Sequence, residues 1–205
     1  MTRPNQLSTL RILLTPLFVS TFLSERVGLQ CASFGVFFVA SMTDWYDGYV
    51  ARKSGSVSPW GKFLDPLADK ILILSALLAL YLRGYVRLWM VAAIAVRDVA
   101  ITILRSYALL TERPVQTLPI AKWKTVSQVV AIYLALALHT LSLVGMQTSL
   151  ARAVVGWSQE VDLVGKTMAF VAVYTVVTGV IYLIENRGHV RSLAVRFFRA
   201  FAPLN

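Results

Sequence analysis

The sequence predicts an all-α, polytopic membrane protein with six transmembrane helices and a short C-terminal interfacial helix. Of its 205 residues, 57% are hydrophobic and 15% are charged, which disfavours a water-soluble domain of ordinary composition. Apolar runs of about 20 residues recur along the chain, and a helix of this length crosses the hydrocarbon of a bilayer. The polar breaks between the runs are too short for a separate soluble domain.

Six apolar runs define the predicted transmembrane helices. They span approximately residues 7–24, 29–52, 61–82, 86–110, 119–143 and 161–184. The breaks between them contain Gly, Pro, Ser or charged residues, which favour turns. The last break, from about Gly145 to Glu160, is expected to be a loop. We assign residues 1–185 to a transmembrane domain and residues 186–205 to a basic cytoplasmic tail.

Basic residues dominate the charge of the chain. Twenty Lys and Arg residues against ten Asp and Glu residues give a formal net charge of +10. In a membrane protein such residues set the topology and contact anionic lipid headgroups, so nucleic-acid binding is not predicted. Most of them flank the two termini and the breaks near Lys53 and Arg113, whereas few flank the other breaks. Both termini are therefore expected on the cytoplasmic side.

The tail after Gly188 has the pattern of a short amphipathic helix. Arg196 and Arg199 lie away from its apolar face, which is formed by Val190, Leu193, Ala194, Phe197 and Phe201. This pattern predicts an interfacial helix that lies on anionic membrane lipids.

Four aspartates concentrate in the stretch TDWYDGYVARKSGSVSPWGKFLDPLADK. Asp44 and Asp47 lie near the end of the second predicted helix, and Asp65 and Asp69 lie near the start of the third. Residues three or four apart share one face of a helix. Because KSGSVSPWG breaks the helix, the chain must turn back there, and all four carboxylates can converge at a similar depth.

Convergent carboxylates in a membrane repel each other unless a cation offsets their charge. Oxygen ligands suit hard divalent ions such as Mg²⁺, Mn²⁺ or Ca²⁺, and the lack of His and Cys nearby argues against zinc. The sequence thus predicts a site for one or two divalent metal ions. A divalent-cation carrier is an alternative from another class, although it predicts carboxylates on both sides of the bilayer.

Small residues surround the aspartates. Gly48, Ala51 and Gly61 either let a ligand approach the backbone or serve helix packing. Arg52 either contacts a phosphate or marks the cytoplasmic boundary of the helix. The residue types alone leave both pairs of alternatives open.

The spacing of these residues resembles a known signature. They form the pattern DxxDGxxARx8GxxxDxxxD at Asp44, Asp47, Gly48, Ala51, Arg52, Gly61, Asp65 and Asp69. This pattern is similar to that of the CDP-alcohol phosphatidyltransferase family. The resemblance implies a six-span homodimeric membrane enzyme that transfers a phosphatidyl group from CDP-diacylglycerol to an alcohol and releases CMP.

The resemblance also implies roles for individual residues. Asp44, Asp47 and Asp65 would hold Mg²⁺ or Mn²⁺, and Asp69 would share in ligation or act as the general base beside Asp65. The CDP site would be lined by Asn5, Gly48, Ala51, Arg52 and Gly61, where Asn5 belongs to the opening PNQLSTLR.

Basic residues of the fourth and fifth predicted helices are candidates for binding the acceptor. Arg97 and Arg105 project to roughly the same side of the fourth helix. Arg97 lies too deep to mark a boundary only, although it has Asp98 beside it as a possible partner. Lys122 and Lys124 follow Pro119 at a helix N-terminus, which is a favourable place for a phosphate or simply a cytoplasmic flank.

Four stretches, TDWYDGYVAR, FLDPLADK, AVRDVAITILR and IAKWKTVSQ, also resemble those of bacterial phosphatidylglycerophosphate synthases. The acceptor of those enzymes is glycerol 3-phosphate, and a bacterial inner membrane is the implied location. The alternatives are the same reaction with phosphatidylglycerol, as in cardiolipin synthases of this family, or with an inositol phosphate.

Overall fold

A computed structural model describes residues 3–54, 59–110, 119–145 and 148–201. Side chains are described over a smaller part of the chain, namely residues 9–43, 68, 70–108, 123–145, 148–193 and 195. Every regular element in the described residues is a helix, which confirms the all-α prediction.

Eight helices make up the described structure. In chain order they are α1 (Arg3–Leu23), α2 (Val27–Ser54), α3 (Pro59–Leu82), α4 (Leu88–Leu110), α5 (Pro119–Val144), α6 (Ser149–Glu160), α7 (Leu163–Glu185) and α8 (Arg187–Phe201). Six of them, α1 to α5 and α7, correspond to the six predicted spans. The prediction of a C-terminal helix is also confirmed, by α8.

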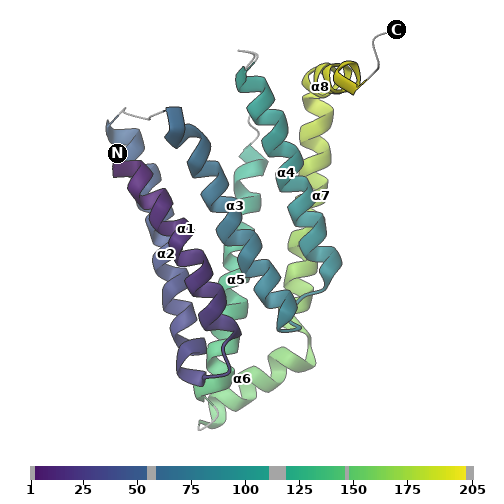
Figure 1. Cartoon of the computed structure of the whole chain (residues 1–205). Helices are drawn as coiled ribbons and strands as arrows, with labels where there is room; N and C mark the ends of the chain where they lie inside the picture. The colour runs from purple at the N-terminus through teal and green to yellow at the C-terminus, as the bar shows by residue number, and fades with distance from the viewer. Residues whose placement is uncertain (1–2, 55–58, 111–118, 146–147, 202–205) are drawn as a thin grey trace.

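The long helices run alongside one another and α6 lies across one end of them (Figure 1). Both chain termini and α8 lie at the opposite end. α1 packs against α2 and α3, whereas α7 packs against α4 and α5. The buried core is apolar and includes Phe18, Phe37, Leu80 and Ile94. The start of α1 and the helix α8 therefore share one end of the molecule, and the cytoplasmic location of that end remains a prediction.

Two of the described helical segments are long and apolar enough to cross a membrane: Trp123–Val144 and Leu163–Glu185. Shorter apolar segments occur at Thr9–Leu23, Val27–Thr43 and Lys70–Leu82, where only part of the helix has described side chains. The helices of the predicted bundle are thus present, while six membrane crossings remain a prediction.

One predicted loop is instead a helix. The loop expected over Gly145–Glu160 contains α6, and that part of the prediction was wrong. The side chain of Thr148 accepts a hydrogen bond from the backbone N–H of Ala151 and caps the start of the helix. The segment is too short and too polar to appear as an apolar run, which is why the hydropathy pattern missed it.

Candidate active site

The two halves of the aspartate motif lie on the two helices expected to carry them. α2, which contains Asp44 and Asp47, ends at Ser54, and α3, which contains Asp65 and Asp69, begins at Pro59. The predicted break between the two motif helices is therefore confirmed. Pro59 occupies the first position of α3, where a backbone N–H would have no partner within the helix and its absence costs no hydrogen bond. The end of α2 and the start of α3 lie at the same end of the molecule as the chain termini (Figure 1).

The side chains of the motif lie outside the described part of the structure. This applies to the four aspartates and also to Asn5, Gly48, Ala51, Arg52 and Gly61. Among the side chains that are described, no group of three or more His, Cys, Asp or Glu residues could hold a metal ion. Convergence of the carboxylates thus stays a prediction, and its support is the chemistry of the residues: four oxygen donors on two adjoining helix ends suit Mg²⁺ or Mn²⁺.

Asn5 lies in the first turns of α1, a helix that contacts both motif helices. α1 begins at Arg3 and packs against α2 and α3. Its N-terminus also lies at the motif end of the molecule (Figure 1). The backbone therefore brings Asn5 to the end where the nucleotide is expected, and its contact with a nucleotide remains a prediction.

A buried ion triad connects α4 to α5. The Nζ atom of Lys124 lies 2.5 and 2.6 Å from the two carboxylate oxygens of Asp98. Arg97 donates to the same carboxylate from Nη1, at 3.2 Å from Oδ1. Lys124 is only 2% exposed and Asp98 is also buried. Two cations share one carboxylate, so the triad keeps one net positive charge in a region of low dielectric.

Arg97 extends from the triad toward α7. A Cβ atom at Gly179 would lie 2.7 Å from Cγ of Arg97, so the arginine occupies space that only glycine leaves free. Within the described part of the chain, the buried Nε and Nη2 atoms of Arg97 have no hydrogen-bond partner. The guanidinium thus keeps hydrogen-bonding capacity that no described protein group uses.

Arg105 contacts the same helix as Arg97. Its Nε donates to the hydroxyl oxygen of Tyr182 at 3.3 Å, and its guanidinium carbon lies 5.6 Å from the centre of that ring. Tyr182 is completely buried, whereas Arg105 is exposed. The prediction that both arginines project to one side of α4 is confirmed, since both contact α7.

The structure brings together some of the predicted acceptor residues. Arg97 and Lys124 both bond to Asp98. Arg105 lies about two turns further along α4. The side chain of Lys122 is outside the described residues. Asp98 has a larger part than the sequence indicates, because it pairs with Lys124 as well as with Arg97. The sequence did not predict that Gly179 and Tyr182 contact these arginines. Both are uncharged residues in an apolar helix, and nothing in a single sequence distinguishes them from residues that only pack.

Residues 1–161 of the chain match the CDP-alcohol phosphatidyltransferase family. The chain belongs to this family. The matched range contains the whole aspartate motif together with Arg97, Arg105, Lys122 and Lys124. It ends before α7, so the residues that contact Arg97 and Arg105 from that helix lie beyond it.

Individual members of the family with known names are also similar to the chain. A CDP-diacylglycerol–glycerol-3-phosphate 3-phosphatidyltransferase of Bacillus subtilis is 39% identical over 150 residues, which are 67% of this chain and 77% of the relative. A protein of the same name from Rickettsia bellii is 30% identical over 87% of this chain and 92% of the relative. The CMP-forming cardiolipin synthase of Oryza sativa is 35% identical over 70% of this chain but only 48% of its own length.

Proposed function

We propose that this protein transfers the phosphatidyl group of CDP-diacylglycerol to glycerol 3-phosphate, giving phosphatidylglycerophosphate and CMP. The observation that carries the proposal is the complete eight-residue motif, placed on the ends of α2 and α3 inside a region that belongs to the family. The relatives named for this reaction in Bacillus subtilis and Rickettsia bellii support the choice of acceptor.

The proposed setting is a bacterial inner membrane that six helices cross. Two helices of sufficient length and apolar character support it, as does the arrangement of α1 to α5 and α7 in one bundle. The end that carries the motif and both termini would face the cytoplasm, where CDP-diacylglycerol headgroups and water-soluble glycerol 3-phosphate meet. Association into a homodimer is part of the same proposal and rests on family resemblance.

The motif residues would bind the donor substrate. Asp44, Asp47, Asp65 and Asp69 would hold one or two Mg²⁺ or Mn²⁺ ions, which supply neutralisation of the diphosphate charge when bound. Asp69 would accept the proton of the attacking hydroxyl while the oxygen of that hydroxyl bonds to the phosphatidyl phosphorus. The bond from that phosphorus to the CMP oxygen breaks, and CMP leaves with the bonding electrons.

The cationic residues of α4 and α5 would bind the phosphate of the acceptor. Lys124 is already paired with Asp98, whereas Arg97 keeps two donors and Arg105 is exposed. The unused donors of Arg97 and the exposure of Arg105 therefore favour these two residues as direct phosphate ligands. Lys124 would act chiefly by fixing Asp98, and Lys122 would add positive charge at the start of α5.

The principal alternative is the same chemistry with another acceptor. Similarity to a cardiolipin synthase favours phosphatidylglycerol as that acceptor, and an inositol phosphate is a further possibility. The divalent-cation carrier has no support from the named relatives, all of which are transferases or synthases.

Parallel assays of CMP release distinguish these acceptors. The purified protein is given CDP-diacylglycerol and Mg²⁺ together with glycerol 3-phosphate, inositol phosphate, serine or phosphatidylglycerol. We expect release of CMP with glycerol 3-phosphate and no more than background with the others. Asp47→Asn is the matched inactive control. Equal release with every acceptor, or faster release with phosphatidylglycerol, would overturn the proposed acceptor.

A further inference from the structure

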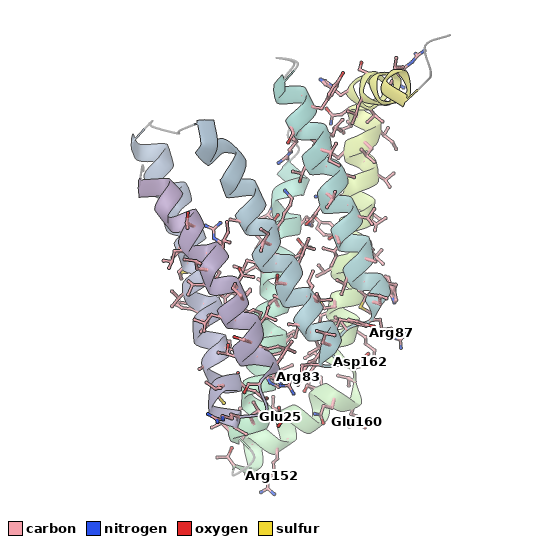
Figure 2. The ribbon with its side chains drawn as sticks, viewed as in Figure 1. Glu25, Arg83, Arg87, Arg152, Glu160 and Asp162 are labelled. Carbon is pink, nitrogen blue, oxygen red and sulfur yellow. The ribbon has the colours of Figure 1, made fainter. Side chains whose placement is uncertain are left out.

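α6 lies across the end of the bundle opposite the motif, joining α5 to α7 (Figure 1). Charged side chains gather at this end: Glu25, Arg83, Arg87, Arg152, Glu160 and Asp162 (Figure 2). Among them, Arg152 points away from the long helices. In the proposed membrane setting, the level of the bundle at which these charged side chains gather marks the boundary between hydrocarbon and water.

The surface of α6 is divided into three faces. Ala151, Val155 and Ser158 are buried, and the helix packs against α5 and α7. Leu150, Val154 and Trp157 form a second, apolar face on which the three side chains are 76%, 40% and 57% exposed. The third face is exposed and polar, with Arg152, Gln159 and Glu160.

These faces follow one another around the helix axis at about 100° per residue. The exposed apolar face adjoins the buried face, and the polar face lies opposite the two taken together. A helix on the surface of a soluble protein has one buried face and a polar remainder. α6 has a second apolar face beside the first. This is the arrangement of a helix that contacts protein on one face, lipid on the adjoining face and water on the remaining face.

Both ends of α6 are held in place. At its start, a Cβ atom on Gly145 would lie 2.7 Å from Cβ of Ala151, so α5 and α6 approach closely at this corner. At its end, Asp162 adopts a left-handed conformation with φ of 50° and accepts a hydrogen bond from the backbone N–H of Gly165 at 3.2 Å. The orientation of its apolar face is therefore set by the fold.

The helices that α6 connects are themselves apolar on the outside. Val144, at the α6 end of α5, is exposed, and so are Phe170 and Val173 in the first half of α7. A lipid phase in contact with these helices thus reaches the level of α6. Trp157 has an amphipathic ring of the kind that concentrates at the bilayer interface.

We propose that α6 is an interfacial membrane-binding helix whose partner is the lipid leaflet at the end opposite the motif. Leu150, Val154 and Trp157 enter the boundary between headgroups and acyl chains, while Arg152 and Glu160 stay in water. Because these two charges cancel, the affinity of α6 for the lipid leaflet does not depend on anionic lipid. The basic helix α8, by contrast, is expected to prefer anionic lipid. This inference rests on the proposed membrane setting.

Spin labels attached to single cysteines test the proposal. In a Cys31→Ser background, Leu150→Cys and Val154→Cys report the apolar face of α6, and Gln159→Cys is the matched control on the same helix. Phe170→Cys, on the exposed surface of α7, reports the membrane setting itself. Each labelled protein is reconstituted in vesicles of phosphatidylcholine alone and with one third phosphatidylglycerol. Collision rates with oxygen, which concentrates in lipid, and with a water-soluble nickel chelate are then compared.

We expect labels at 150 and 154 to have an oxygen-to-nickel collision ratio at least ~10-fold above that at 159, equally in both vesicle types. Equal, water-like ratios at all three positions with a lipid-exposed label at 170 would overturn the α6 proposal alone. A water-exposed label at 170 would instead overturn the membrane setting. Dipolar broadening at 150 that disappears on dilution with unlabelled protein would assign the apolar face to a second copy of the chain, contrary to the proposal.

Discussion

At the scale of single residues, Asp98 is the carboxylate that a cation of α4 and a cation of α5 share. It accepts hydrogen bonds from Lys124 on α5 and from Arg97 beside it on α4. A buried ion pair adds little net stability, but the loss of one partner leaves an uncompensated charge. In the proposed acceptor site, Asp98 would therefore act through Arg97 and Lys124 and would not contact the acceptor phosphate itself.

Replacing Asp98 with Asn removes the negative charge and keeps the shape of the side chain. We expect the free energy of unfolding to fall by about 3 kcal/mol, because Lys124 becomes a buried cation without a counter-charge. The KM for glycerol 3-phosphate should rise about 10-fold, while the KM for CDP-diacylglycerol should change by less than about 2-fold. Thermal unfolding in detergent and initial rates of CMP release measure the two effects.

Asp98→Glu is the matched control, since it keeps the charge and should retain most of the affinity for glycerol 3-phosphate. A lower stability of Asp98→Asn with both KM values unchanged would show that the triad is structural only.

Gly179 makes room for Arg97 and provides a second test at this scale. A Cβ atom there would lie 2.7 Å from Cγ of Arg97, so Gly179→Ala must displace the arginine. We expect the KM for glycerol 3-phosphate to rise about 10-fold, equivalent to ~1.4 kcal/mol of binding free energy. Gly156→Ala in α6, where nothing lies within 4 Å of the added atom, is the control. If the two variants have the same KM, the position of Arg97 does not affect the acceptor.

At the scale of helices, the turn between α3 and α4 is closed by backbone hydrogen bonds. Gly84 has φ of +81°, its N–H donates to the carbonyl of Tyr81 at 2.9 Å, and the N–H of Tyr85 donates to the carbonyl of Leu80 at 2.9 Å. This is the hydrogen-bond pattern of a Schellman motif, in which glycine takes the left-handed position.

Gly84→Ala should lower the free energy of unfolding by about 1 kcal/mol, because the left-handed conformation is strained for any residue with a Cβ atom. Thermal unfolding in detergent gives this difference. Gly28→Ala, in a helix and with open space around it, serves as the comparison. A loss of stability no larger than that of Gly28→Ala would contradict the role assigned to Gly84.

The helices also show which features a single sequence can predict. Apolar runs predicted the six long helices, and the break around Lys53 correctly separated the two halves of the motif. α6 was not predicted, since it is short and mixes apolar with polar residues and owes its position to packing on α5 and α7. The pairing of Lys124 with Asp98 could not be predicted either, because it depends on how α4 and α5 align in space.

At the scale of the whole molecule, the two proposed functional parts lie at opposite ends of the helical bundle. The end that carries the termini holds the ends of α2 and α3 with the aspartate motif, and α4 and α5 carry the ion triad. The opposite end carries α6 and a concentration of charged side chains. The proposed catalytic part and the proposed interfacial helix α6 are thus at opposite ends of the same helices.

Transfer of radiolabelled glycerol 3-phosphate into lipid tests the central claim most directly. Purified protein is incubated with CDP-diacylglycerol, labelled glycerol 3-phosphate and Mg²⁺, and the label extracted into chloroform is compared with the CMP released. We predict one labelled lipid molecule for each CMP, and no transfer by Asp47→Asn or after removal of divalent metal. CMP release without label in the lipid, or label transferred equally by Asp47→Asn, would contradict the account.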